Sequence, residues 1–220
     1  MASPPPPATD GLPEKGSTGG PLLTLLARGL EFWLRQRCQA VCELEIQLEG
    51  SVAELVRGHL QGVRLQARQV VFQNLSLEQV ELRSEAIQVR VGGLLRGQNL
   101  RLDHPFRVRG SVLFTGEGLS RSLATPAWQE LGNQLCEQLI GVTPLEGVSL
   151  QGEILILRAH APHGPAQVET RLVLSPEGLE VRPVDGRPAL PLPMDEAITL
   201  ERAEVRAGRM ELAGEALVRP

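Results

Sequence analysis

The sequence predicts an α+β fold that is mainly β, with mostly antiparallel strands and a few amphipathic helices. Several segments alternate apolar and polar side chains, as Leu44, Ile46 and Leu48 do against Glu43, Glu45, Gln47 and Glu49. This is the period of a strand with one buried face. The strand-like segments follow one another instead of alternating with helices, which favours antiparallel neighbours over a doubly wound parallel sheet.

The first element after residue 20 has helical period. From Pro21 to Val41, an apolar stripe of Leu22, Leu26, Leu30 and Trp33 lies opposite Thr24, Arg28, Glu31 and Arg35. Pro21 suits the first turn of a helix.

Two more helices are expected. Ser51 and Glu54 form a capping-box pattern for a short helix over residues 52–57, and Thr125 with Pro126 suits the start of a helix that ends at Gly141. The predicted strands include residues 63–67, 75–82, 87–91, 106–114, 148–157, 168–174, 179–181 and 210–218.

The domain organisation is simple. Residues 1–20 contain the run Pro4 to Pro7 and almost nothing apolar, so they are expected to form a disordered tail. Residues 21–220 are expected to form a single domain, because no second shift in composition interrupts them.

Composition limits the possible partners and compartment. The net charge of −4 argues against nucleic-acid binding, which needs clustered positive charge. The three cysteines have no framework spacing, no secretory signal is evident, and the most apolar stretch, 22–34, is too short to span a bilayer. A cytoplasmic protein is therefore expected, with peripheral association with a membrane as an open alternative.

No catalytic or metal-binding constellation stands out. His160 and His163 lack the third ligand that a zinc site needs and are interpreted as a solvated turn. Asp195 and Glu196 are interpreted as surface carboxylates, and Cys38, Cys42 and Cys136 as buried small hydrophobes. No metal, no cofactor and no enzymatic activity are predicted.

Two features leave alternatives open. The arginine pairs Arg64 with Arg68 and Arg107 with Arg109 suit either phosphate head groups or the wet face of a strand. The first helix either packs on the protein's own sheet, or lies on a membrane with Arg28, Arg35 and Arg37 near the head groups.

The segment from Asp103 to Pro126, DHPFRVRGSVLFTGEGLSRSLATP, resembles the LmeA-like phospholipid-binding family in its strand-to-helix step at Phe114 and Thr115. The elements before it, including the short helix that ends at Gly58, look like the family's N-terminal half. The resemblance covers residues 22–219 and brings no catalytic residues. It implies a long, strongly curved antiparallel sheet wrapped around amphipathic helices, with an apolar groove similar to those of tubular lipid-binding proteins. The Pro-rich head is not part of the family pattern.

The leading hypothesis is non-enzymatic binding of a phospholipid or other acyl lipid in an apolar groove. Candidate groove residues are the inward-facing strand positions Ile46, Leu48, Val63, Leu65, Ile87, Val89, Val112, Phe114, Ile154 and Ile156. Candidate membrane-helix residues are Leu22, Leu26, Leu30 and Trp33. The alternative is a scaffold protein with a filled core that acts through protein contacts.

Overall fold

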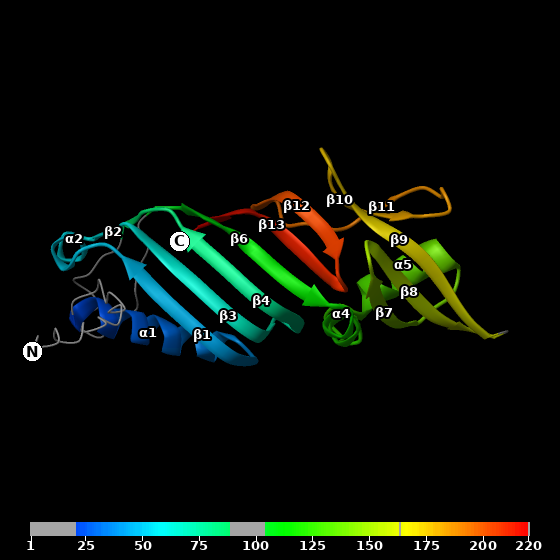
Figure 1. Ribbon diagram of the computed structural model, residues 1–220, viewed down its shortest axis with the longest axis horizontal. Coiled ribbons are helices and arrows are strands. Elements are labelled where there is room, and N and C mark those ends of the chain that lie inside the picture. Colours follow the sequence, from blue (N-terminus) through cyan, green and yellow to red (C-terminus); the bar gives the residue numbers. More distant parts are fainter. Residues whose placement is uncertain (1–20, 89–103, 163, 220) are drawn as a thin grey trace, which may run out of the picture.

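The computed structural model describes residues 21–88, 104–162 and 164–219. These residues form an elongated molecule with two main antiparallel sheets and a two-stranded one (Figure 1). The six-stranded sheet, called the large sheet, and the first helix occupy one end, and the five-stranded sheet, called the small sheet, occupies the other with two helices. The predicted mainly β, α+β fold is therefore confirmed, with most strands divided between the two main sheets. The predicted tail, residues 1–20, lies outside the described residues.

The large sheet has the strand order β1-β3-β4-β6-β13-β12, and every neighbouring pair is antiparallel. Its strands are β1 (Ala40–Glu49), β3 (Gly62–Phe72), β4 (Leu75–Ser84), β6 (Phe106–Thr115), β13 (Arg209–Val218) and β12 (Ile198–Arg206). The first four follow chain order, whereas β13 returns from the C-terminus to pair with β6. The last two strands thus depend on pairing between residues about 100 positions apart.

One helix and three short elements pack together at one end of the large sheet. These are α1 (Pro21–Arg37), α2 (Val52–Val56), β2 (His59–Leu60) and β5 (Ile87–Gln88). The predicted capping box is present: the Ser51 hydroxyl accepts a hydrogen bond from the Glu54 backbone N–H, and the Glu54 carboxylate accepts from the Ser51 N–H at 2.9 Å. Helix α1 ends at Arg37, four residues before the predicted end.

The small sheet has the order β11-β10-β9-β8-β7. Its strands are β7 (Leu145–Gln151), β8 (Ile154–Ala161), β9 (Gly164–Ser175), β10 (Gly178–Pro183) and β11 (Leu190–Pro191), and the helices α4 (Gly116–Leu123) and α5 (Gln129–Ile140) pack beside it. One cluster of buried residues joins these elements to the ends of β6, β12 and β13, with Phe114, Leu157, Val181, Val205 and Met210 among its members.

The structure corrects the start of the third predicted helix, the one that ends at Gly141. Thr125 is not an N-cap, because its hydroxyl donates to the Ser122 carbonyl at 2.6 Å and closes the end of α4. Helix α5 begins at Gln129 and ends, as predicted, at Gly141, whose φ of 83° favours glycine. The strand-to-helix step implied by the family resemblance is present, since the Thr115 hydroxyl caps α4 by accepting from the Gly118 N–H.

A pair of facing glycines sets the curvature of the large sheet. Gly110 on β6 lies directly opposite Gly214 on β13. A Cβ at Gly110 would stand 2.0 Å from the Glu81 carbonyl oxygen, and one at Gly214 would stand 2.2 Å from the Thr199 carbonyl oxygen. The backbones of β4 and β12 therefore lie close to Gly110 and Gly214. The sheet curls towards the face on which a Cβ of these two glycines would lie.

Candidate functional site

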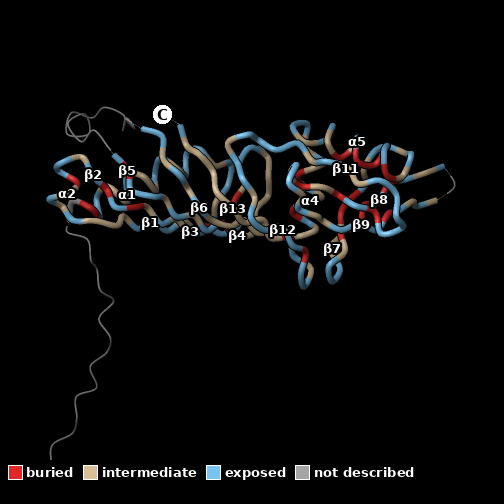
Figure 2. Tube along the Cα trace, turned by 90° about the horizontal axis from the view of Figure 1, so that it is seen from above, coloured by how far each residue is buried: buried red, intermediate tan, exposed pale blue. Residues whose placement is uncertain are grey.

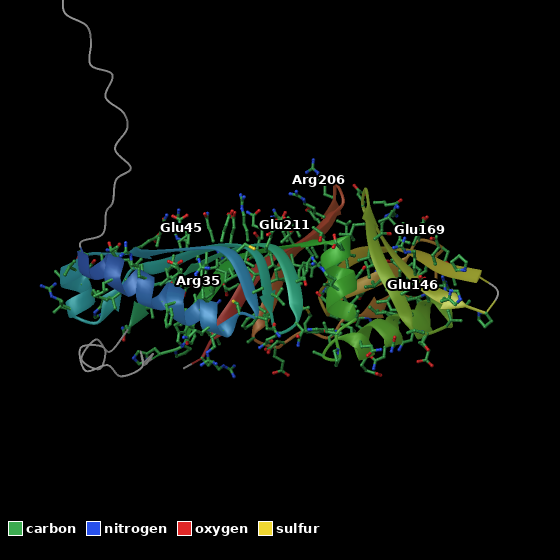
Figure 3. All side chains as sticks on the ribbon, turned by 90° about the horizontal axis from the view of Figure 1, so that it is seen from below. Arg35, Glu45, Glu146, Glu169, Arg206 and Glu211 are labelled. Atoms are coloured by element: carbon green, nitrogen blue, oxygen red, sulfur yellow. The ribbon has the colours of Figure 1, made fainter. Side chains whose placement is uncertain are left out.

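The two faces of the large sheet differ in chemistry. We call the face that carries Leu44, Ile46 and Leu48 of β1 the inner face, and the opposite one the outer face. The outer face is charged, and Figure 3 shows Glu45 and Glu211 projecting from the same side of the sheet. Inner and outer residues alternate along β1 from Glu43 to Glu49, so the sequence period of two directly produces the two faces there.

Ion pairs cover the outer face. The Glu49 carboxylate accepts from Arg64 at 3.1 Å and from Arg83 at 3.0 Å, and Glu215 pairs with Arg107 and Arg109. The hydrogen bond from Arg107 is the main reason that the pKa of Glu215 lies below its usual range. Both predicted arginine pairs therefore lie on a solvated face beside carboxylates, which is the second of the two readings left open by the sequence.

The outer face also carries two hollows. One of about 680 Å³ lies mainly over outer-face side chains, including Arg64, Gln66, Arg83 and Arg109. A second, of about 530 Å³, lies beside Glu43, Glu45 and Arg68. Their charged linings do not suit an acyl chain, because burying a charge against hydrocarbon is costly.

The inner face is aliphatic from one edge of the sheet to the other. Its central row crosses all six strands through the directly paired residues Ile46, Leu65, Leu82, Gly110, Gly214 and Leu200. Ile46 is buried, while the rest of the central row is only half-buried. At a strand spacing of about 4.8 Å, Leu65 and Leu200 are roughly 19 Å apart along this row.

Three apolar clusters lie around the central row. The first, at the N-terminal end, holds Leu23 of α1 with Leu55, Leu60 and Ile87. The second holds Ala67, Val70 and Val80 on β3 and β4, and the third joins the two sheets. Figure 2 shows buried residues gathered around the small sheet, whereas the strands of the large sheet are mostly half-buried or exposed. The central row therefore crosses the least covered part of the apolar interior.

The predicted groove residues fall in different places. Five of them share the inner face of the large sheet: Ile46, Leu48, Val63, Leu65 and Val112. Ile87 lies in the cluster with Leu23, and Phe114 lies in the cluster between the sheets. Ile154 and Ile156 lie on β8 of the small sheet, and Val89 lies outside the described residues.

The residues that complete the central row were not singled out from the sequence. Leu82 lies in a predicted strand, but Leu200 lies in β12, for which no strand was predicted. Gly110 and Gly214 have no side chain for a hydrophobic pattern to detect. An isolated glycine within a strand-like segment is nevertheless a recognisable sign of a bend or a close backbone approach.

The predicted membrane-helix residues do not form one exposed stripe. Leu26 and Leu30 are half-buried, and Leu26 packs against the cluster around Leu23. Trp33 is 48% exposed, and the side chain of Leu22 is not described. Instead, among the side chains of the helix that the structure describes, Leu25 and Phe32 are the most exposed apolar ones, at 67% and 66%.

The remaining sequence candidates are dispersed. Asp195 and Glu196 are exposed, and Asp195 accepts from the Ala197 N–H in a turn. His160 is exposed on β8, while His163 lies outside the described residues. Within the described ranges, no three His, Cys, Asp or Glu residues gather as metal ligands.

The cysteines have three different environments. Cys136 is fully buried, as predicted, and its burial raises the pKa of the thiol to about 11. Cys38 is half-buried, with a thiol pKa that is also raised by burial. Cys42 is exposed, so the prediction that it is buried is wrong; it lies on β1, an edge strand of the large sheet.

The chain also matches a known protein family. The family model described as LmeA-like phospholipid-binding matches residues 18–215. The chain belongs to the LmeA-like phospholipid-binding family. The family resemblance seen in the sequence is thus confirmed, and the match includes both sheets and α1. No curated protein and no solved structure matches the chain. Of the helices that the structure describes, none has the length and apolar character needed to cross a membrane.

Proposed function

We propose that this LmeA-like protein binds a phospholipid without chemical conversion, and that an acyl chain lies on the inner face of the large sheet along the central row. The observation that carries the proposal is the half-buried, largely aliphatic surface between α1 and the small sheet, on a chain whose family is described as phospholipid-binding. The apolar side chains there keep solvent-accessible surface that a hydrocarbon chain can cover.

The lining suits an acyl chain. Leu65, Leu82 and Leu200 are aliphatic, and the glycine pair leaves the middle of the row without side chains. Backbone atoms of the neighbouring strands occupy the Cβ positions of the glycine pair, so the contact with the hydrocarbon is made by the three leucines. Covering apolar area contributes about 25 cal/mol per Å² before the costs of association, so the contact need not include any hydrogen bond to be favourable.

The difference between the faces favours binding on one side only. An acyl chain on the outer face would have to displace water from the Glu49 and Glu215 ion pairs, which involve Arg64, Arg83, Arg107 and Arg109. Desolvating such groups costs free energy without a compensating partner. This difference supports the proposed position of the hydrocarbon on the inner face, with the polar head group towards solvent.

The proposal is tested by lipid content. The full chain is purified without detergent, and its bound lipid is measured by native mass spectrometry and by extraction. We expect the purified protein to retain phospholipid. The variant Ala216→Phe, which adds a ring to the inner face two residues from Gly214, is expected to lower the bound fraction markedly.

Ala213→Phe provides the matched control. It makes the same substitution on the same strand, but on the outer face, where Ala213 pairs with Ser111. We expect this variant to retain lipid at the wild-type level. Absence of phospholipid from the wild-type protein, together with no uptake from vesicles, would contradict the proposal, and so would equal retention by both phenylalanine variants. A filled core that acts through protein contacts would then be the better account.

A further inference from the structure

Helix α1 has an apolar surface on the side that its packing leaves free. Leu23 is 3% exposed and packs inwards, whereas Leu25 and Phe32 are the exposed side chains named above. At 100° per residue, Leu25 and Phe32 lie about 20° apart around the helix axis, and Trp33 lies about 80° from Leu25. We call Leu25, Phe32 and Trp33 the outward stripe.

Arginines flank the outward stripe on both sides. Arg28 and Arg35 lie about 60° and 80° from Leu25 on one side, and Arg37 lies about 120° from it on the other. The Arg37 guanidinium stands 5.1 Å from the centre of the Trp33 ring, and Arg35 pairs with Glu31 at 2.9 Å. The three arginines against one glutamate give α1 a charge of +2, in a chain whose net charge is −4.

We infer that the outward stripe of α1 docks the protein on the surface of an anionic phospholipid bilayer. Large apolar side chains with arginines beside them suit a helix that lies in the plane of the interface. The positive charge of α1, against the negative charge of the whole chain, favours an anionic surface and orients this side towards it. Trp33 beside Arg37 suits the head-group boundary, where an aromatic ring has one apolar and one wet side.

Docking in this orientation would bring the inner face of the large sheet close to the bilayer from which it would take up phospholipid. Helix α1 packs along β1, at the edge of the same sheet that carries the central row (Figure 1). The uptake of lipid from the bilayer rests on the proposed function, whereas the docking of α1 does not. Attachment to vesicles and retention of lipid are measured separately, so that the docking can be disproved without disproving lipid binding, and the reverse.

The test is flotation of the full chain with vesicles of phosphatidylcholine, with and without phosphatidylglycerol. We expect attachment to the anionic vesicles, weaker attachment to the neutral ones, and a loss of about fivefold in affinity for each arginine replaced among Arg28 and Arg37. The double variant Leu25→Glu/Phe32→Glu is expected to bind about a hundredfold more weakly, since two apolar side chains no longer enter the interface.

The matched control is Val184→Glu/Met194→Glu. It makes the same change in net charge at two exposed apolar residues outside α1: Val184, in the turn after β10, and Met194, in the connection between β11 and β12. We expect it to bind vesicles close to the wild-type level, and both double variants to keep the wild-type melting temperature. Equal binding by the two double variants would overturn the inference, and so would a wild-type protein that binds neither vesicle.

A second measurement does not depend on the stability of the glutamate variants. Trp128→Phe leaves Trp33 as the only tryptophan of the two in the chain. We expect brominated acyl chains in anionic vesicles to quench its emission and to shift the emission to the blue. No quenching under conditions in which the protein floats would overturn the inference. So would a dimer that forms through the outward stripe, detected by sedimentation and abolished by Leu25→Glu/Phe32→Glu.

Discussion

Replacement of two neighbouring leucines on α1 distinguishes its packed side from its free side. Leu23→Ala removes a side chain that is 3% exposed and contacts the cluster of Leu55, Leu60 and Ile87. Leucine-to-alanine changes in a packed core cost about 2–5 kcal/mol, and a cluster this small at one end of a sheet suggests about 3 kcal/mol. Leu25→Ala, two residues along and 67% exposed, should change the free energy of unfolding by less than about 0.5 kcal/mol.

The assay is urea unfolding followed by far-ultraviolet circular dichroism. For a domain of this size, a loss of 3 kcal/mol corresponds to a decrease of roughly 6–12 °C in melting temperature. The m-value should be the same in both variants and the wild type, because the fold is unchanged. A difference of less than about 1 kcal/mol between the two variants would refute the packing of α1 by its Leu23 side.

Two further predictions follow from single residues. Because the folded state holds Cys136 as a neutral thiol with a pKa near 11, its contribution to stability is complete below the ordinary thiol value of 9.0 and is lost as the pH rises from 9 to 11. The loss should be about 2–3 kcal/mol, seen as a fall in the urea midpoint that is much smaller in Cys136→Ala and unchanged in Cys42→Ala; an unchanged slope in Cys136→Ala would contradict the assignment. Gly110→Ala should destabilise the protein by at least about 2 kcal/mol, because its Cβ would meet the Glu81 backbone, whereas Gly29→Ala, in an exposed helix position with open space around it, should be stabilising. A Gly110→Ala variant with wild-type stability would show that the sheet does not curl at the glycine pair.

Local elements were predictable because their signals lie within a few residues. Ser51 and Glu54 hydrogen-bond to each other in the capping box, so four consecutive residues are enough to predict the start of the short helix α2. The alternation from Glu43 to Glu49 likewise determined which side chains share a face, as the pairing of Ile46 with Leu65 shows.

The division into two sheets depends on contacts that are distant in sequence. Strand β13 pairs with β6 across about 100 residues, and no pattern within either strand specifies that partner. The predicted groove residues therefore included Ile154 and Ile156 on the small sheet together with Ile46 and Leu65 on the large one.

Two predictions differ from the structure because the same local sequence pattern is compatible with two arrangements. Thr125 followed by Pro126 satisfies the rule for a helix start, but the Thr125 hydroxyl closes the end of α4 instead. In α1, apolar residues lie on both sides of the helix, so the sequence identified one stripe and assigned Trp33 to it. Only packing shows that Leu26 faces the cluster around Leu23 while Leu25 and Phe32 face outwards.

The most direct test of lipid binding on the inner face is photocrosslinking with a phospholipid that carries a diazirine in its acyl chain. After incorporation from vesicles and irradiation, labelled residues are mapped by peptide mass spectrometry. We expect labels on inner-face residues, with Leu65, Leu82 and Leu200 the most frequent. Labels confined to the outer face, around Glu81, Arg83 and Ala213, would contradict the proposed site.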